Sequence, residues 1–278
     1  MNTFSLNLAD PIRDAISRIR FAPHSNNLLI SSWDSSLRLY DVDSSKLRME
    51  APGEAELLDC CFENERVCFS AATDGSVNRY DLDSGIKVSL GNHDDSATCV
   101  EYSAETCQII TAGWDKKINF WDARSTQSHG CLRSFVSEDL LLDQLMGELF
   151  WSTSPNPAHM RGQYAFRCHP KVKDGRRHVV TVNDIAFNPS IIGSFVTGDN
   201  DGYATLWDAR GKKRIFEMSR YPNSVVSLSY SHDGLLLAVA SSYSYQEANE
   251  KEVPPQIFIH EIGNCDLTSP SSGASNKK

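Results

Sequence analysis

Apolar and polar positions alternate in short segments that recur at nearly constant spacing along this chain. Apolar residues occupy the first, fourth and sixth positions of five such segments, at 16–21, 57–62, 97–102, 182–187 and 225–230. A denser apolar run follows, as at 28–30, 109–110 and 195–196, and then an Asp or Asp-Gly turn. This pattern predicts half-buried β-strands that are joined by tight hairpins.

The third strand of a repeat ends in an aromatic-Asp pair. The turn aspartates that precede these pairs stand at 34, 74, 115 and 201, so the intervals are 40, 41 and 86 residues and the last holds two periods. A period of about 40–45 residues with this ending is typical of a four-stranded propeller blade. Such a blade cannot bury its faces alone, and we therefore predict an all-β fold, a WD-repeat β-propeller.

The repeats predict one domain over residues 1–263, with an irregular insertion at about 136–162 and a disordered tail at 264–278. The final repeat, 225–262, supplies three strands and has no aromatic-Asp ending. We expect residues 4–8 to add its outer strand, which would tie the two chain ends together and close the ring.

The interval 125–181 departs from the repeat, because it contains no Asp turn followed by an aromatic-Asp pair. Apolar residues at 140, 141, 145 and 149 predict a short amphipathic helix over 138–151. Pro155 and Pro157 follow, and proline cannot supply central strands. We expect the ring to be open, strained or reduced to six blades, with low order around 136–162.

Two repeats carry a matching set of polar residues. The first set is His93, Thr111, Asp115 and Trp121, and the second is His178, Thr197, Asp201 and Trp207. A buried imidazole that links a hydroxyl, a carboxylate and an indole N–H would satisfy every member of a set. We interpret both sets as structural, because the nucleophile of a catalytic grouping would point into a blade.

Two tryptophans stand immediately before a turn aspartate, where other repeats have Thr73 and Asn200. These are Trp33 and Trp114. Because this position lies at the mouth of a hairpin, we expect the indoles to be half-exposed neighbours on one face of the ring and to anchor a peptide. The alternative, that both indoles fill gaps between blades, stays open.

Composition and motifs narrow the classes of function. The net charge of −9 argues against binding to nucleic acid or to an anionic membrane, which needs a basic field. The eight cysteines form no CxxC pair, which predicts reduced core thiols in a cytosolic or nuclear protein. We find no Gly-rich phosphate loop, metal-spaced His/Cys set or nucleophile elbow, and expect neither an enzyme nor a cofactor. No run reaches the roughly 18 apolar residues that span a bilayer.

Several strings resemble the Bub family of WD-repeat checkpoint proteins (budding uninhibited by benzimidazole). They are 29–41 (LISSWDSSLRLYD), 58–62, 113–115, 164–169 (YAFRCH), 195–199, 220–224 and 237–243. The resemblance covers about 2–130 and 164–262, and its SSWD and YAFRCH strings are far more specific than a generic WD pattern. Because family members have seven blades, it implies that this chain lacks about one blade and that a second is disturbed.

The resemblance also implies a function, that of a non-enzymatic scaffold of the spindle assembly checkpoint. It implies a nuclear protein that is at the kinetochore in mitosis and has a cytoplasmic pool. The top face would bind the GLEBS motif of checkpoint kinase-like partners, and the flank would bind phosphorylated MELT repeats of a kinetochore scaffold.

Candidates for the phosphopeptide lie in the basic stretch 161–178. They are Arg167, Lys171, Arg176 and Arg177, with Arg161 and Lys173 nearby. Guanidinium groups bind phosphate bidentately and suit this task. A solvated loop is an equal alternative, because the family's other phosphate-facing basic residues fall in the missing blade.

Two questions stay open at the level of sequence. Residues 131–135 are similar to the opening strand of the family's fifth blade although they follow the third, which fits a splice variant, a faulty gene model or a true six-bladed member. The second candidate function is that of the related messenger-RNA-export adaptor, which binds a nuclear-pore peptide on a similar face. The charge of −9 disfavours its nucleic-acid-linked role.

Overall fold

The computed structural model of the chain describes residues 2–6, 8, 11–123, 133–136, 148–151, 164–167, 170–173, 176–243 and 253–263. Between 124 and 179 it describes the backbone of five short strands and no side chains. Every regular element in the described residues is a β-strand. The sheets are antiparallel and are built from consecutive hairpins, as the alternating sequence pattern predicts.

Three complete blades come first along the chain. The first blade contains β2 (Ile16–Phe21), β3 (Asn27–Ser32), β4 (Ser36–Asp41) and β5 (Lys46–Pro52). The second contains β6 (Leu57–Asn64), β7 (Val67–Ala72), β8 (Ser76–Asp81) and β9 (Lys87–Asn92). The third contains β10 (Ala97–Ser103), β11 (Gln108–Gly113), β12 (Lys117–Asp122) and β13 (Arg133–Val136).

Two hairpins and two further complete blades follow. The hairpins pair β14 (Glu148–Trp151) with β15 (Tyr164–Arg167) and β16 (Pro170–Lys173) with β17 (Arg176–Val179). The penultimate blade contains β18 (Val182–Phe187), β19 (Ser194–Asp199), β20 (Ala204–Asp208) and β21 (Lys213–Glu217). The closing blade contains β22 (Ser224–Tyr230), β23 (Leu236–Ser242), β24 (Gln256–Glu261) and β1 (Thr3–Ser5).

The N-terminal strand completes the closing blade. β1 pairs antiparallel with β24, with Phe4 opposite Ile259, and the backbone N–H of Leu6 donates to the carbonyl of Ile257 at 2.8 Å. The expectation that residues 4–8 supply the missing outer strand is confirmed. Because β1 comes from the other end of the chain, its pairing connects the first and last blades through the backbone.

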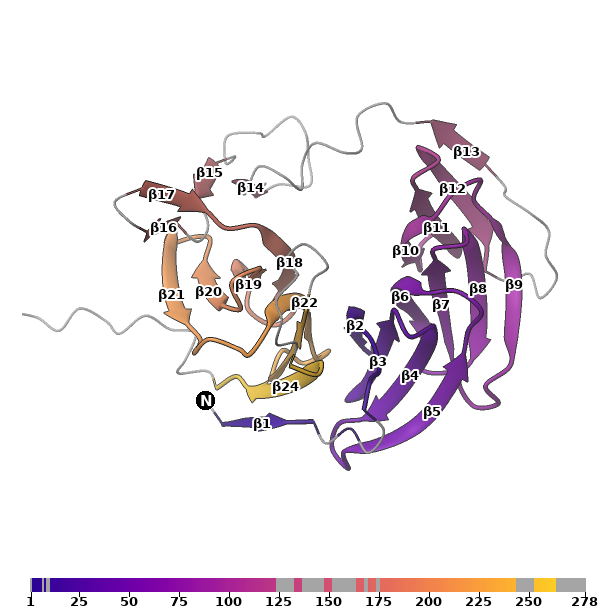
Figure 1. Cartoon of the computed structure of the whole chain (residues 1–278), viewed down its shortest axis with the longest axis horizontal. Helices are drawn as coiled ribbons and strands as arrows, with labels where there is room; N and C mark the ends of the chain where they lie inside the picture. The colour runs from indigo at the N-terminus through magenta and orange to yellow at the C-terminus, as the bar shows by residue number, and fades with distance from the viewer. Residues whose placement is uncertain are drawn as a thin grey trace, which may run out of the picture.

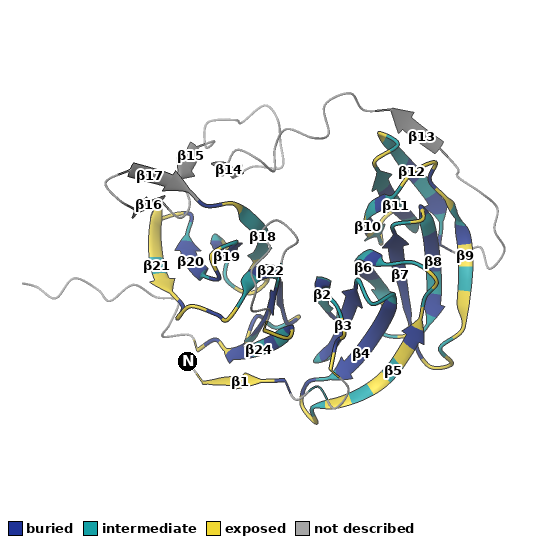
Figure 2. Cartoon of the chain, in the orientation of Figure 1, coloured by how far each residue is buried: buried dark blue, intermediate teal, exposed yellow. Residues whose placement is uncertain are grey.

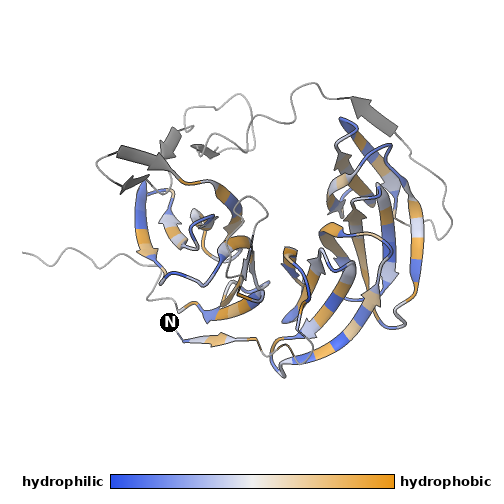
Figure 3. Cartoon of the chain, in the orientation of Figure 1, coloured by the Kyte–Doolittle hydropathy of each residue, from blue (hydrophilic) through white to orange (hydrophobic). Residues whose placement is uncertain are grey.

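The blades stand side by side in an arc with their first strands innermost (Figure 1). Along its inner side β18, β22, β2, β6 and β10 contact one another in that order. The second strands β3, β7 and β19 are buried along their whole length (Figure 2). The outer strands β5, β9 and β21 include exposed positions, and each carries both hydrophilic and hydrophobic residues (Figure 3). The second strands are buried because they have a strand on each side within the blade, whereas the outer strands border solvent.

The apolar cores lie between blades. Leu37 of the first blade packs in one cluster with Tyr80 of the second, and Phe69 of the second packs in another with Trp121 of the third. Tyr40 of the first blade shares a cluster with Ile257 of the closing blade. The aromatic residues of the aromatic-Asp pairs are therefore core residues.

Two expectations for the irregular interval are wrong. Residues 148–151 form strand β14 and not the end of a helix, since Leu149, Phe150 and Trp151 pair in register with β15 and are residues that favour strands. Residues 133–136 form the outer strand of the third blade and do not open a new one, because pairing with β12 satisfies the backbone groups of its free edge. Residues 137–147 and 152–163, with Pro155 and Pro157, lie outside the described residues, as does the tail 264–278.

Each of the five innermost strands contains a β-bulge next to its second residue. The register shifts fall at 16/18, 57/59, 97/99, 182/184 and 225/227. The third position then carries a polar or sulfur-containing side chain in every blade. These residues are Arg18, Asp59, Cys99, Asp184 and Ser227.

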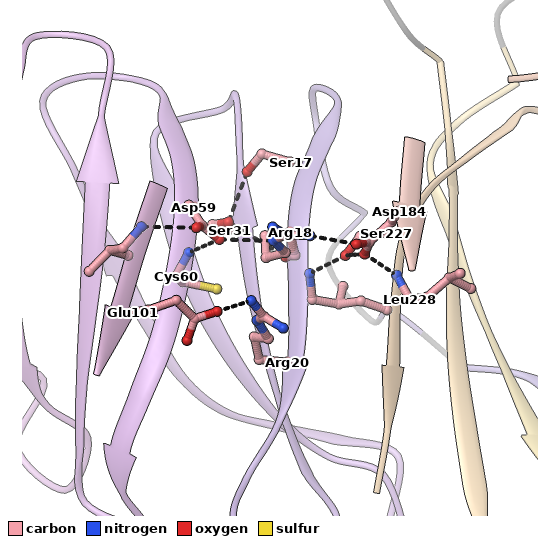
Figure 4. A network of polar contacts seen from close by, with 12 residues as sticks. Ser17, Arg18, Arg20, Ser31, Asp59, Cys60, Glu101, Asp184, Ser227 and Leu228 are labelled. Atoms are coloured by element: carbon pink, nitrogen blue, oxygen red, sulfur yellow. Dashed lines mark hydrogen bonds and ion pairs between the residues drawn. The ribbon is translucent and has the colours of Figure 1, made fainter. Parts of the chain in front are cut away.

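Arg18 joins three of these strands through an ion network (Figure 4). Its Nε donates to Asp59 Oδ1 on β6 and its Nη1 to Asp184 Oδ1 on β18, both at 2.9 Å. The second oxygen of Asp59 accepts the backbone N–H of Val100 at 3.0 Å, and that of Asp184 accepts the N–H of Leu228 at 2.8 Å. Each carboxylate thus bonds Arg18 and the backbone of the next inner strand.

The network is nearly enclosed, so its charges must compensate one another. The Asp59 side chain is 3% exposed and that of Arg18 is 25% exposed. Burial opposes the charge of Arg18, but Asp184 and Asp59 together hold its pKa above the usual value. Arg20 and Glu101 form a second ion pair across the inner strands. Removing one member of such a set would leave a buried charge without its counterion.

We expect Arg18→Met to lower the free energy of unfolding by about 3 kcal/mol, because it leaves two carboxylates without their cation while keeping the apolar stem. Urea denaturation followed by tryptophan fluorescence measures this change. Arg66→Met is the matched control, since Arg66 and Asp83 form an exposed pair at 3.5 Å that contributes less than about 1 kcal/mol. Equal, small effects of the two substitutions would contradict a structural role for the network.

Candidate peptide-binding site

Four hairpin turns present their first residue in the same way. The backbone N–H of Trp33, Thr73, Trp114 and Asn200 donates to the carbonyl of Ala15, Glu56, Ser96 and Thr181, respectively, at 2.8–3.0 Å. Each bond connects the turn to the residue that precedes the inner strand of the same blade. Because the bond recurs, all four turns lie at the same face of the arc.

The two tryptophans of this face differ in exposure. The side chain of Trp114 is 69% exposed, whereas Trp33 is partly buried. They belong to the first and third blades, so the second blade lies between them and they are not on adjacent blades. An exposed indole on a fixed turn is a suitable anchor for an apolar group of a partner.

The turn of Trp33 is fixed by a buried ion pair. Arg38 Nη2 lies 2.8 Å from Asp34 Oδ2 and 3.0 Å from Glu50 Oε1, and the Arg38 side chain is 4% exposed. Burial opposes ionisation of Asp34, but hydrogen bonds from Arg38 and Ser36 hold its pKa below the ordinary value. Sequence analysis missed Arg38; its signal is a basic residue between two apolar ones in Leu37-Arg38-Leu39, four residues after the turn aspartate.

The turn of Trp114 is fixed by a chain of hydrogen bonds. Trp121 Nε1 donates to Thr111 Oγ1 at 2.8 Å, and that hydroxyl lies 2.7 Å from His93 Nε2. His93 Nδ1 lies 3.0 Å from both oxygens of Asp115, next to Trp114. Since a carboxylate only accepts, His93 donates to Asp115 through Nδ1. The structure therefore brings the four residues of the first predicted set together.

Asp115 is held in its charged form. Burial opposes its ionisation, but the backbone N–H of Lys117 and the His93 ring keep the pKa of its carboxyl below the ordinary value. Thr111 is fully buried and the side chain of His93 has no exposed surface. A hydroxyl and an imidazole enclosed in this way are not accessible to a substrate.

The second predicted set is only partly described. Trp207 Nε1 donates to Thr197 Oγ1 at 2.8 Å, as its counterpart does in the third blade. Asp201 is exposed, and the side chain of His178 lies outside the described residues. Asp199 is fully buried in this turn, and its Oδ1 accepts the backbone N–H of Tyr203 at 2.7 Å.

The basic candidates fall on two separate hairpins. Arg167 is on β15, opposite Glu148 of β14. Lys171 is on β16, and Arg176 and Arg177 are on β17, so these three share one two-stranded sheet. Their side chains lie outside the described residues.

The described part of the chain contains no group of three or more His, Cys, Asp and Glu residues that could hold a metal ion. Its cysteines are free thiols; Cys60, Cys61 and Cys68 are buried, and burial raises the pKa of Cys60 to about 12. Among the same residues, no helix has the length and apolar character required to cross a membrane.

Comparisons with known proteins agree with the repeat pattern. The family model "WD domain, G-beta repeat" matches residues 8–41 and 86–122. The chain is 40% identical to mitotic checkpoint protein BUB3.3 of Arabidopsis thaliana, over 92% of the chain and 98% of that protein. It is 32% identical to mitotic checkpoint protein bub3 of Dictyostelium discoideum, over 91% and 93%. The alignment with the Arabidopsis protein runs over 309 positions although the chain has 278 residues, so part of that relative has no counterpart here.

More distant similarity extends to other WD-repeat proteins. A poly(A)+ RNA export protein of Schizosaccharomyces pombe is 23% identical over 92% of the chain and 90% of its own length. The solved structure of U3-55K superposes with a TM-score of 0.73 at 11% identity, covering 94% of the chain and 98% of that structure. This structural likeness supports the propeller fold alone.

For the polar set of the third blade, we expect His93→Ala to lower the free energy of unfolding by about 1–3 kcal/mol, because it removes the imidazole hydrogen bonds of the buried Thr111 hydroxyl and of Asp115. The pKa of Asp115 is lowered from its ordinary 3.8, so its stabilisation is present above that pH and is lost as the pH falls through the folded-state value. Stabilities of the native chain and of Asp115→Asn should therefore converge on acidification, as measured by urea denaturation across a pH series.

Asp83→Asn is the control for both measurements, because Asp83 is exposed and pairs only loosely with Arg66. If it shifted stability as much as His93→Ala did, or if the gap between native chain and Asp115→Asn persisted in acid, the assignment would be wrong.

Proposed function

The chain belongs to the Bub3 family of WD40 mitotic checkpoint proteins, and we propose that it is a non-enzymatic scaffold of the spindle assembly checkpoint. Its face with Trp33 and Trp114 binds GLEBS-type peptides of checkpoint kinase-like partners. It acts in the nucleus and at the mitotic kinetochore, with a cytoplasmic pool. The kinetochore partner is a scaffold with phosphorylated MELT repeats.

The exposed indole of Trp114 is the observation that carries this proposal. A 69% exposed tryptophan would be unfavourable on a surface without a partner, and it stands on a turn fixed by its own backbone bond and by Asp115. Trp33 stands at the equivalent turn of the first blade, fixed by Arg38. Two preorganised indoles on one face lose little conformational entropy when a peptide binds.

The phosphopeptide site is the weaker half of the proposal. Lys171, Arg176 and Arg177 lie on the single hairpin β16–β17, and no complete four-stranded blade in the described residues lies between the third and penultimate blades. Phosphate binding usually combines several charge-assisted hydrogen bonds. One basic hairpin supplies fewer of them than a complete flank would.

A role in messenger-RNA export is the alternative function. The export protein of S. pombe aligns over 92% of the chain but at 23% identity, compared with 40% for the checkpoint protein of A. thaliana. Identification of proteins captured by the tagged chain from mitotic and interphase extracts separates the two. Checkpoint kinase-like proteins support the proposal, and nuclear-pore proteins alone would replace it.

We expect Trp33→Ala combined with Trp114→Ala to abolish binding of a GLEBS-type peptide, because truncating one anchoring indole typically costs about 2–4 kcal/mol of binding free energy. Isothermal titration calorimetry measures the affinity, and the thermal transition should change little. The matched control is Thr73→Ala with Asn200→Ala, which alters the two equivalent turns that carry no indole. Undiminished affinity in the tryptophan double variant would exclude this face.

Binding of a phosphorylated MELT peptide should be weak or absent, because the flank retains only one basic hairpin. Fluorescence anisotropy compares this chain with a variant that carries a family-like blade between Ser125 and Tyr164. We expect the restored blade to strengthen binding, and the unphosphorylated peptide serves as the control. Equally tight binding by both proteins would show that the hairpin alone suffices.

A further inference from the structure

At one position of the repeat, a side chain occupies the interior of the third and closing blades, whereas the second blade has a glycine there. The backbone N–H of His93 donates to the carbonyl of Gly75, and that of Tyr221 donates to Gly202. Gly53 makes the same bond to Ser35, at 2.5 Å. The side chains of His93 and Tyr221 are buried in their blades, and Gly53 has no side chain to place there.

The second blade contains a pocket at this place. Its volume is about 300 Å³, and its walls include Gly53, Leu57, Ala72, Asp74, Asn78 and Tyr80. A Cβ atom at position 53 would lie 2.7 Å from the Ser35 carbonyl oxygen, so this backbone does not accept a side chain without shifting. The pocket is thus a built feature of the second blade.

The residues that surround the imidazole in the third blade have counterparts around this pocket. By strand register, the lining residues Asp74, Asn78 and Tyr80 correspond to Asp115, Asn119 and Trp121. Ser70 corresponds to Thr111 and does not line the pocket itself, but its hydroxyl bonds that of Tyr80. In the third blade the His93 ring connects the threonine hydroxyl with the turn carboxylate. The second blade keeps a hydroxyl, the carboxylate, the amide and an aromatic ring, and lacks the imidazole.

The polar groups of the pocket are not connected to one another across it. Ser70 Oγ donates to the Tyr80 hydroxyl at 3.3 Å, Asn78 Nδ2 donates to Ser76 Oγ at 3.0 Å, and Asp74 Oδ1 accepts the Ser76 N–H at 2.9 Å. Within the described residues, no hydrogen bond joins Asp74 to Asn78 or to Tyr80. A ring with a nitrogen on each side could bridge these groups as His93 does in the third blade.

We propose that this pocket binds an imidazole ring, as the side chain of a histidine that a bound peptide presents. The Asp74 carboxylate accepts a hydrogen bond from one ring N–H, and the Tyr80 hydroxyl or the Asn78 amide donates to the other ring nitrogen. The pocket wall also contains Glu54 and Lys87, so its charged side chains are two carboxylates and one ammonium. Its volume leaves space for water beside the ring.

One difference between the second and third blades affects where an imidazole ring can lie in the pocket. Ala72 stands where the third blade has Gly113, and a Cβ at Gly113 would lie 2.8 Å from His93 Nδ1. A ring in the second blade must therefore lie a few tenths of an ångström further from Ala72 than His93 lies from Gly113. A ligand ring can move by this amount, because it is not tethered to residue 53.

The position of the pocket indicates a peptide as the source of the ring. The Gly53 N–H bonds to Ser35, two residues after Trp33, and the second blade lies between the blades of Trp33 and Trp114. A peptide that spans the two indoles crosses the mouth of the pocket. This part of the inference rests on the proposed function, whereas binding of imidazole itself does not.

Free imidazole tests the pocket directly in the full chain. Imidazole titrated into the ¹⁵N-labelled protein should shift the backbone amide resonances of Gly53 and Asp74 saturably, in the millimolar range that a ligand of so few atoms permits. Pyrazole is the matched control ligand, because its adjacent nitrogens cannot bridge groups on opposite sides of the ring. Absence of saturable shifts, or equal shifts with pyrazole, would overturn the proposal.

Single substitutions make the test specific to the second blade. Asp74→Asn should weaken imidazole binding by about tenfold, and Tyr80→Phe should weaken it less. Ala72→Gly should strengthen it roughly threefold by relieving the close approach. Asp201→Asn changes the turn carboxylate of another blade and should have no effect. Equal affinity in Asp74→Asn and Asp201→Asn would contradict the site.

Two further variants separate this inference from the proposed function. The double variant Trp33→Ala, Trp114→Ala should bind imidazole as the native chain does, even though it loses the peptide. His93→Gly should create a second imidazole site in the third blade, reported by the amides of Gly113 and Asp115. Loss of imidazole binding in the tryptophan variant would show that the ring binds the indoles and not the pocket.

Discussion

The Arg18 guanidinium joins blades that are not adjacent in sequence, and the arrangement of the inner strands depends on it. It bonds Asp59 of the second blade and Asp184 of the penultimate blade, and each carboxylate also holds the backbone of the next inner strand. Ser227 extends the same network, since its hydroxyl donates to Asp184 and accepts the N–H of Ile19. A bulge in every inner strand brings the third residue to this place. The network therefore adds directional bonds between blades to the non-directional packing of the apolar cores.

Different residues stabilise the interiors of the first, third and closing blades. In the third blade His93 joins Asp115 to Thr111 by hydrogen bonds, and in the first blade Arg38, at the repeat position of Asn119, holds the turn aspartate by a buried ion pair. In the closing blade Tyr221 pairs with His260, which in turn contacts Thr3 of the N-terminal strand. That last contact adds a side-chain bond to the backbone pairing that joins the chain ends. In the second blade Gly53 stands at the position of His93 and Tyr221, and a pocket takes the place of their side chains.

Features that repeat within each blade can be predicted from the sequence, whereas contacts between distant blades cannot. The hairpins follow from periodicity and the pairing of the N-terminal strand follows from the missing strand of the last repeat, and the structure confirms both. The Arg18 network has no such signal, because Arg18, Asp59 and Asp184 become neighbours only after the blades surround a common axis. The pocket beside Gly53 was missed since it arises from an absent side chain. The prediction of a helix that includes residues 148–151 is wrong, because a short apolar run fits a helix or a strand until its partner strand is known.

The irregular interval and the indole-bearing face lie on different blades, which separates the two proposed binding sites physically. Phe187 of the penultimate blade is 57% exposed. The equivalent residues Phe21 and Tyr230, whose blades have a complete blade on each side, are 8% exposed. The described residues place no complete blade before β18, so the face of the penultimate blade next to the irregular interval is less covered. Trp33, Trp114 and the second-blade pocket belong to three consecutive complete blades that the inner network connects. A departure from the family pattern between the third and penultimate blades would therefore affect the proposed phosphopeptide flank and leave intact the three blades that present the indoles.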